Sequence, residues 1–389
     1  MNKDRILKIL RVISSASPLG GGPIYSLLES STALEDRGVS VHILTLDHPN
    51  DSFLKKIPFT LFPLGKGAKF KYHYNKIVAK WLVNHIDNYD VVIIEGLWQN
   101  HSRITAKIAK QKNCPYLVIP HGMLAPWFKK FHFKYQLKRL FWILFERSVI
   151  NNAQGVLFTC KQELLSARES FPFYFPKEKI VSLGCGSVSP ENISNILNID
   201  FEYYLFLGRI DPIKGIDNLI IGYANAKSRT TRTMPKIMLV GPSSKKYEMQ
   251  LKSLALEYKV ESDIVFYGPC FNEQKWELIN KSSALILPSF HENFGMVVCE
   301  ALSLGVPVLI SKYVNIQCDI FEEKAGVIFD NSPQGIALTL LSFTDMSSCR
   351  KNEMSKNGLN MYNKFYTNKS AAIALNNVIE SVYQSVKVR

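Results

Sequence analysis

The 389-residue sequence lacks any apolar run long enough to cross a bilayer, since a spanning helix needs about 20 apolar residues. Its longest purely apolar stretch is Leu140–Phe145, which lysine and arginine flank closely. The N-terminus also lacks the basic region, long apolar segment and small-residue cleavage site of a signal peptide. We therefore expect a cytoplasmic protein, either free or peripheral on the inner face of the cell membrane.

Patterns of a disulfide framework or a metal site are missing too. The seven cysteines are dispersed, odd in number and include no C-x-x-C pair. That fits a reducing compartment and argues against a zinc knuckle. No D-x-D occurs, and the eight histidines show no ligand spacing. The expectation is a protein that needs no metal and no other cofactor.

Positive charge is in excess, because 47 lysines and arginines face 33 acidic residues, for a net charge of +14. A surplus of this size favours an anionic partner: nucleic acid, an acidic membrane or a phosphorylated substrate. No helix-turn-helix, zinc finger or RNP-like motif is visible, so no nucleic-acid partner is expected. The basic and aromatic region 126–145, with a second patch at Lys66–Lys76, suits an interfacial helix on anionic lipid. A partly buried helix with solvated lysines fits the region 126–145 equally well.

Strand-like and helix-like segments alternate twice along the chain, which predicts parallel sheets covered by helices on both faces. The expected architecture is α/β, with two Rossmann-like, doubly wound domains facing a cleft. We expect an N-terminal domain over 1–185, a linker over 186–200 and a second domain over 201–369. The segment 370–389 is expected to be a helix crossing back to the first domain. The predicted strands are Ile6–Ser14, Val41–Leu46, Val91–Glu95, Tyr116–Ile119, Gly155–Phe158, Tyr203–Leu207, Lys236–Val240, Ile264–Tyr267, Ala284–Leu287 and Val306–Ile310.

One candidate site follows the strand Tyr203–Leu207, where Gly208-Arg209 and Lys214-Gly215 bracket a short loop. Ligands of open α/β sheets bind beyond the carboxyl ends of the strands, where this loop lies. Arg209 and Lys214 combine a planar fork of donors with a point charge, which suits a diphosphate. Two solvated surface charges are the plain alternative.

A second candidate site follows the strand Ala284–Leu287. Glu292 falls in the loop, and Phe294-Gly295 open a helix whose free N–H groups can bind an anion or hydroxyl. Glu300 lies farther along that helix among apolar neighbours, so its carboxylate needs a partner if it is buried. Either a pair of sugar hydroxyls or a lysine at the rim of the helix would be a suitable partner for this carboxylate.

Together, Gly208-Arg209 to Lys214-Gly215 and Glu292-x-Phe294-Gly295 with Glu300 resemble family 4 of the retaining glycosyltransferases, which have the GT-B fold. The segment 121–127 is similar to a branch found in bacterial polysaccharide clusters. The resemblance implies a retaining, metal-independent transfer of a sugar from a UDP- or GDP-linked donor to a glycan acceptor. The branch points to a lipid-linked acceptor in surface polysaccharide biosynthesis. The alternative is a non-catalytic, basic nucleotide- or nucleic-acid-binding protein on a GT-B-like scaffold.

The resemblance also implies roles for individual residues. Arg209 and Lys214 would hold the diphosphate, and Glu292 would contact the transferred sugar. Glu300 would hold the ribose hydroxyls, while His121 would face the donor sugar, although an isolated histidine is otherwise more often structural. The remaining donor-binding residues would act through backbone groups or close approach: Gly21, Gly22, Phe294, Gly295, Met296 and Val297.

One segment departs from the family pattern. After the strand Val306–Ile310, many relatives carry a Gly-Gly-x-x-Glu stretch that supports the donor phosphates. This sequence has Lys312–Gln317 there instead. Asn315 is the candidate for a donor contact in that segment.

Overall fold

The computed structural model describes residues 6–20, 22–65, 75–126, 129, 132–182, 184–193, 195–270 and 272–387. The chain divides into two compact units. The first comprises Met1–Gly184 and Asn368–Arg389, and the second comprises Cys185–Thr367. Residues 186–200 thus group with the second unit, and the C-terminal segment from Asn368 groups with the first.

The first unit is built on a parallel sheet with strand order β3-β2-β1-β4-β5-β6-β7. Strand order reverses between β1 and β4, so the loops after these two strands diverge there and leave room for a ligand. The strands are β1 Lys8–Val12, β2 Ser40–Thr45, β3 Thr60–Pro63, β4 Val91–Glu95, β5 Tyr116–Ile119, β6 Gly155–Phe158 and β7 Glu178–Ile180.

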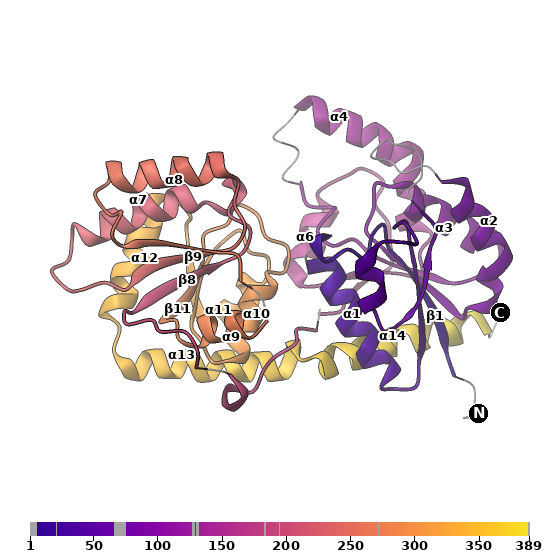
Figure 1. The fold of residues 1–389 in the computed structure, drawn as a ribbon. Coiled ribbons are helices and arrows are strands. Elements are labelled where there is room, and N and C mark those ends of the chain that lie inside the picture. Colours follow the sequence, from indigo (N-terminus) through magenta and orange to yellow (C-terminus); the bar gives the residue numbers. More distant parts are fainter. Residues whose placement is uncertain are drawn as a thin grey trace. The chain divides into compact units, whose positions relative to one another are not determined.

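Helices cover both faces of this sheet because successive strand residues point to opposite sides. One face, with Ile9, Ile43 and Ile93, packs against α1 and α14, which run side by side in Figure 1. The other, with Leu10 and Val92, packs against α2, α3, α5 and α6. The helices are α1 Gly22–Glu35, α2 Lys76–His85, α3 Asn100–Gln111, α4 His132–Phe141, α5 Arg147–Asn151, α6 Lys161–Arg168 and α14 Asn368–Lys387, with 3₁₀ turns at Pro18–Gly20, Ser52–Lys56 and Ile86–Asn88.

Helix α4 continues into a π-helical segment, η5 Trp142–Glu146, before α5. Trp142 is fully buried and stacks on Phe171, while Tyr135 packs against the same core. Trp142 and Tyr135 therefore turn toward the core, whereas Phe141 and Phe145 are partly exposed. Leu137, Leu140 and Leu144 are instead 55%, 56% and 58% exposed. Trp127, Phe128, Lys130, Phe131 and 66–74 of the two expected basic and aromatic patches lie outside the described residues.

The second unit has a parallel sheet of order β10-β9-β8-β11-β12-β13, and its order reverses between β8 and β11. The strands are β8 Tyr203–Leu207, β9 Lys236–Val240, β10 Ile264–Gly268, β11 Ala284–Leu287, β12 Val308–Ser311 and β13 Gly326–Phe329. Strands β8, β11 and β12 are buried along their whole length, as the continuous apolar runs indicate.

The helices of the second unit connect these strands. Helix α7 packs against both α8 and α12, and α10 packs against α13. The helices are α7 Ile216–Lys227, α8 Lys245–Glu257, α9 Asn272–Asn280, α10 Met296–Ser303, α11 Gln317–Glu322, α12 Pro333–Asp345 and α13 Ser348–Met361. A 3₁₀ turn Pro190–Asn192, another at Pro212–Lys214 and a π-helical segment Tyr362–Tyr366 complete the unit.

The two-domain α/β architecture expected from the sequence is confirmed. Every strand expected from the sequence is present, with ends that differ by up to two residues. Three short strands were not anticipated: β3, β7 and β13. Each lies at an edge of its sheet and is only partly buried on average, and the sequences of β3 and β7 are also less apolar than those of the central strands. Among the described helices, none is both long and apolar enough to span a membrane.

Candidate functional site

The loop after β8 is held against the loop after β11, its neighbour at the reversal point of the second sheet. Gly215 has φ of 66°, and a Cβ at this position would lie 2.3 Å from the carbonyl oxygen of Pro288. Only glycine allows both this conformation and this approach. The Phe290 N–H also donates to the Ile213 carbonyl at 2.8 Å. The close approach fixes the position of Lys214.

Lys214 and Glu292 form an ion pair across these two loops, although they lie 78 residues apart in the sequence. Both side chains are mostly shielded, with 17% and 22% exposure. The neighbouring His291 is also largely buried, and this burial, with Lys214 adding to it and Glu292 opposing it, lowers the pKa of His291. The pair places a cation and a carboxylate side by side at the carboxyl edge of the sheet.

Arg209 lies on the same loop and is the most accessible of these side chains, with 69% exposure. Its Nε forms an ion pair with Asp211 Oδ2 at 2.9 Å, and Asp211 Oδ1 accepts from the Ile213 N–H at 3.0 Å. Asp211 thus caps the 3₁₀ turn at Pro212–Lys214 and holds Arg209 with its other oxygen. The guanidinium keeps further donors for an anion.

The segment that departs from the family pattern lies beside Glu292. The Glu292 N–H donates to the Tyr313 carbonyl at 3.1 Å, and the Asn315 N–H donates to the Glu292 carbonyl at 3.1 Å. The Asn315 side chain donates to Asn293 Oδ1 at 3.2 Å. Residues 313–315 therefore support the Glu292 loop through backbone pairing, which does not depend on a Gly-Gly-x-x-Glu sequence.

Helix α10 begins directly after this loop. Gly295 is its N-terminal cap with φ of 74°, and Phe294 is buried just before it. Met296 and Val297 form the first turn, whose N–H groups have no partner within the helix. Glu300 follows one turn later and accepts from Lys275 Nζ of α9 at 3.0 Å. The lysine partner considered for Glu300 is thus present, and the carboxylate is only 16% exposed.

A hollow of about 530 Å³ lies beside Arg209, bounded by the loops after β8 and β9. Its walls include Asp211, Pro212, Ser243 and Tyr247. This volume is within the range of small-molecule sites. The hollow lies at the edge of the sheet where Arg209 and Lys214 were expected to bind a diphosphate.

In the first unit, His121 follows β5 in a left-handed conformation with φ of 51°. Its Nε2 lies 2.7 Å from Glu95 Oε2, and Glu95 is the last residue of β4. Gly22 is the first residue of α1 and directly follows the loop after β1, while Gly21 lies outside the described residues. His121 and the Gly22 loop therefore both lie at the carboxyl edge of the sheet, around the point where strand order reverses.

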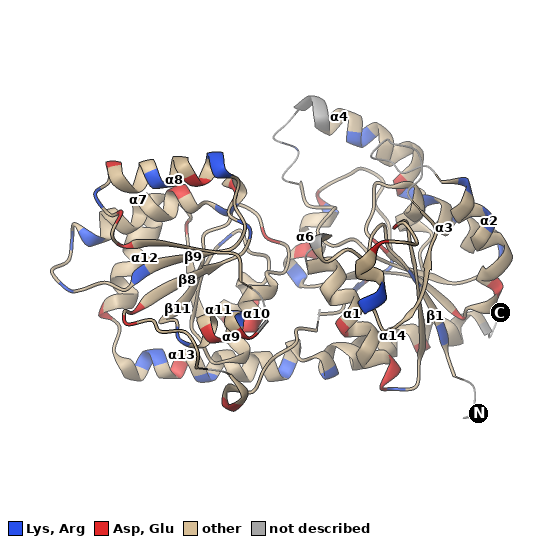
Figure 2. Cartoon of the chain, viewed as in Figure 1, with Lys and Arg blue, Asp and Glu red and all other residues tan. Residues whose placement is uncertain are grey.

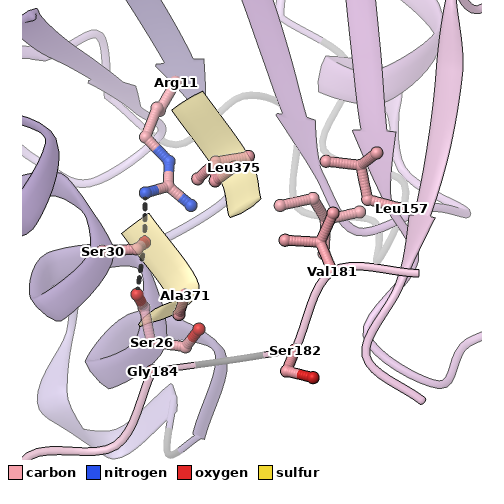
Figure 3. Close-up of a pocket in the computed structure, with 10 residues that line it drawn as sticks. Arg11, Ser26, Ser30, Leu157, Val181, Ser182, Gly184, Ala371 and Leu375 are labelled. Atoms are coloured by element: carbon pink, nitrogen blue, oxygen red, sulfur yellow. Dashed lines mark hydrogen bonds between the residues drawn. The ribbon is translucent and has the colours of Figure 1, made fainter. Parts of the chain in front are cut away.

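A closed hollow near this edge is too small for a substrate. Arg11, Ser26 and Ser30 line it together with Ala371 and Leu375 of α14, and Leu157 and Val181 lie across from them (Figure 3). Its volume of about 20 Å³ would hold about one water molecule. It is a gap between core side chains and not a binding site.

Four polar residues around these sites were not singled out from the sequence. Asp211 and Lys275 hold Arg209 and Glu300, and Glu95 with Arg11 holds His121. Asp211 falls within the Gly208–Gly215 motif, and its place before Pro212 is a cap signal. For the other three, no local pattern identifies the partner, because each pairs with a residue on a different element.

Comparison with protein families finds two matches along the chain. Residues 21–186 match the model described as "Glycosyl transferase 4-like domain", and residues 190–361 match "Glycosyl transferases group 1". Similar curated proteins include D-inositol 3-phosphate glycosyltransferases of Streptomyces bingchenggensis (29% identical over 129 residues, 32% of this chain and 28% of that protein) and Corynebacterium urealyticum (24% over 206 residues, 49% of each). The matches thus span at most about half the length of these two relatives.

Solved structures of the same fold are similar over nearly the whole chain. Sucrose-phosphate synthase from Thermosynechococcus elongatus superposes with a TM-score of 0.76 at 19% identity, covering 97% of this chain and all of that one. Anabaena HepE, solved in complex with UDP and glucose, also gives 0.76, at 18% identity over 96% of this chain and all of that one. At these identities the likeness shows the fold.

Proposed function

Because this chain belongs to the family 4 type of glycosyltransferase and has the GT-B fold, we propose that it transfers a sugar from a nucleoside diphosphate sugar, UDP- or GDP-linked, with retention of configuration. The acceptor is a glycan carried on a lipid, in surface polysaccharide biosynthesis at the cytoplasmic face of the membrane. The observation that carries the proposal is the ion pair between Lys214 and Glu292, which joins the loops after β8 and β11 at the reversal point of the second sheet, with Arg209 on the same loop as Lys214.

Each of these side chains has a chemical task in the proposal. Arg209 and Lys214 bind the diphosphate and neutralise the charge that grows on it as it departs. Glu292 accepts hydrogen bonds from the transferred sugar, and the N–H groups of the first turn of α10 add donors. Glu300 accepts from the ribose hydroxyls, with Lys275 holding the carboxylate in place before the nucleotide arrives.

The proposed reaction occurs on one face of the sugar. The bond between the anomeric carbon and the diphosphate oxygen breaks, and the acceptor oxygen bonds to that carbon from the same side. The acceptor hydroxyl gives its proton to an oxygen of the departing diphosphate. The protein then supplies positioning and electrostatic stabilisation rather than a nucleophile.

The proposal includes independence from metal ions, because the cationic side chains of Arg209 and Lys214 would neutralise the diphosphate in place of a divalent cation. Within the described residues, no three His, Cys, Asp or Glu side chains gather closely enough to hold an ion. Turnover is expected to persist in EDTA. Complete loss on chelation, reversed by Mg²⁺ or Mn²⁺, would refute this part.

The lipid-linked acceptor is supported by the surface of α4 and η5. Leu137, Leu140 and Leu144 recur at intervals of three and four residues, so they form one exposed apolar stripe. Arg139, on another face of α4, is also exposed, and Figure 2 shows basic residues on α4. A helix with apolar and cationic side chains exposed together suits the interface of an anionic bilayer.

The test begins with thermal shifts against UDP, GDP, ADP and CDP, for the wild type and for Glu300→Ala. A ligand at a hundred times its Kd adds about 2.7 kcal/mol, which is readily measured. Stabilisation of the wild type by one nucleoside diphosphate, lost in Glu300→Ala, is expected. Hydrolysis of UDP-glucose, UDP-galactose, UDP-N-acetylglucosamine and GDP-mannose is then followed, with water replacing the acceptor. Absence of both binding and hydrolysis would contradict the proposal.

A further inference from the structure

A buried polar network connects His121 to the interior of the first unit. Glu95 Oε1 accepts from Arg11 Nε at 2.9 Å and from Arg11 Nη2 at 2.5 Å, while Oε2 lies 2.7 Å from His121 Nε2. The Arg11 and Glu95 side chains are 2% and 0% exposed, and that of His121 is 6% exposed. The imidazole is therefore held between the sheet and its own loop with little freedom to turn.

The same guanidinium also holds α1. Arg11 Nη1 donates to the Leu27 carbonyl at 2.9 Å, to Ser30 Oγ at 2.6 Å and to Ser31 Oγ at 3.0 Å. Figure 3 shows the contact with Ser30, which in turn donates to the Ser26 carbonyl. Arg11 thus fixes, through one planar group, both the helix that follows the glycine-rich loop and the carboxylate behind His121.

Stability alone is a weak explanation for this network. A buried ion pair loses much of its Coulomb attraction to the cost of removing both charges from water, and apolar residues of similar volume often do as well. Glu95 is the last residue of β4 and His121 lies just after the end of β5, at the edge where ligands of such sheets bind. The position of the network at the site favours a role in binding or catalysis.

Ionisation of Glu95 determines which ring nitrogen of His121 holds a proton. Burial by itself raises the pKa of Glu95, but Arg11 and the hydrogen bond with His121 outweigh it and lower that pKa. A carboxylate without a proton can only accept, so His121 Nε2 must donate. In the neutral imidazole, Nδ1 is then the acceptor.

We propose that Arg11 and Glu95 are positioning residues that fix His121 as the Nε2–H form, so that Nδ1 accepts a hydrogen bond from a hydroxyl of the donor sugar. This inference rests on the proposed function, because it requires a sugar at the edge of the first sheet. It assigns no proton transfer to His121. The role is to recognise and orient a hydroxyl.

The structure indicates what Glu95→Gln will do. Since Oε1 accepts two hydrogen bonds from Arg11, the amide oxygen of glutamine will take that place and its NH₂ will face His121. The imidazole must then accept at Nε2 and carry its proton on Nδ1. The ring nitrogen facing the sugar changes from acceptor to donor without a change in side-chain size.

Glu163→Gln is the matched control. Glu163 is another buried carboxylate at the same loop, accepting from the Gly122 N–H, the Thr159 N–H and Thr159 Oγ1, each at 2.7 Å. These bonds join its carboxylate to the backbone of Gly122 and to Thr159. Its substitution perturbs the loop that carries His121 but should leave the proton on Nε2.

The experiment measures tautomer and turnover separately, on full-length protein. Long-range ¹H–¹⁵N spectra of ¹⁵N-histidine-labelled wild type, with His121→Ala to assign the signal, should show Nε2–H. Glu95→Gln should show Nδ1–H and Glu163→Gln should not. Hydrolysis of the four nucleotide sugars named above should fall at least about tenfold in Glu95→Gln, as expected for an unmatched buried polar contact.

A double variant separates positioning from a structural role. If Glu95 acts through His121, adding Glu95→Gln to His121→Ala should lower turnover no further. An equal loss in both backgrounds, or an Nδ1–H imidazole in the wild type, would overturn the inference. Failure of the proposed function looks different: the wild type would bind and hydrolyse none of the nucleotide sugars while keeping Nε2–H. That result would overturn the contact with a sugar hydroxyl as well.

Discussion

Lys214 Nζ donates to Glu292 Oε2, joining the loop after β8 to the loop after β11. The pair brings together the two motifs by which the sequence resembles its family. The lysine proposed to bind the diphosphate and the carboxylate proposed to bind the sugar are thus partners of each other. Until a donor binds, the ion pair spares both partly buried side chains the cost of an unpaired charge. In the proposed function, each side chain then exchanges this contact for one with the donor.

Lys214→Ala should lower turnover by about 10² to 10³. In comparable sites, removing one hydrogen-bond donor that stabilises the charge developing in the transition state lowers kcat by about this factor. The decrease should appear in kcat more than in the nucleotide Kd. Lys227→Ala is the matched control, since Lys227 pairs with Asp263 in the same unit outside the site. Hydrolysis kinetics of the accepted nucleotide sugar measure both. Near-normal kcat in Lys214→Ala would remove Lys214 from the site.

Gly215→Ala should reduce both stability and turnover. An alanine there meets the Pro288 carbonyl oxygen at 2.3 Å and adopts a left-handed conformation, which costs an L-residue about 1–2 kcal/mol by itself. Gly38→Ala isolates that second effect, because Gly38 has φ of 82° and nothing lies within 4 Å of its Cβ position. Calorimetric Tm should fall further for Gly215→Ala, and only this variant should lose turnover. Equal shifts would show that the close approach is unimportant.

Glu146 should make stability depend on pH. Burial raises its pKa to about 7, with the Trp98 backbone and Arg103 opposing in part. The folded protein then retains a proton that the unfolded chain loses above its pKa of about 4.5, so stability falls as pH rises from about 4.5 to 7. The loss amounts to about 3 kcal/mol.

Glu146→Gln should remove most of this loss and raise Tm at pH 8. Glu163→Gln provides the contrast, because its carboxylate accepts three hydrogen bonds and its substitution should lower Tm. Calorimetry at pH 5 and pH 8 gives both comparisons. A wild-type Tm that does not fall over this interval relative to Glu146→Gln would contradict the assignment.

The exposed stripe of α4 and η5 should bind anionic membranes. Flotation with vesicles containing phosphatidylglycerol is expected to carry the wild type, and the triple substitution of Leu137, Leu140 and Leu144 by Gln should abolish it. Binding should weaken with salt because cationic side chains contribute. Met249→Gln with Leu256→Gln is the control, since these residues are 71% and 63% exposed on α8. Equal binding by all variants, or none by the wild type, would contradict the proposal.

The central strands and the two motifs were predictable because their signals are local. Buried parallel strands are continuous apolar runs, and Gly208–Gly215 and Glu292–Glu300 each lie within a short stretch of sequence. The strands β3 and β7 were missed since they lie at a sheet edge, where one side is less covered and the sequence is less apolar. For the region 126–145 the sequence left open an interfacial helix and a partly buried one, and the structure places Trp142 in the core. Hydrophobicity specifies a preference for burial but not which face of a helix meets the core.

By itself, the sequence determined that the chain forms two α/β units and that two charged motifs follow strands of the second. Both conclusions follow from periodicity and spacing, which are properties of residues close together in the sequence. Only the tertiary structure decided which charges become partners: Lys214 with Glu292, Lys275 with Glu300, and Arg11 with Glu95 and His121. The physical reason is that such pairs form between elements brought together by sheet order, and the cost of burying a charge selects its partner only after the strands have assembled.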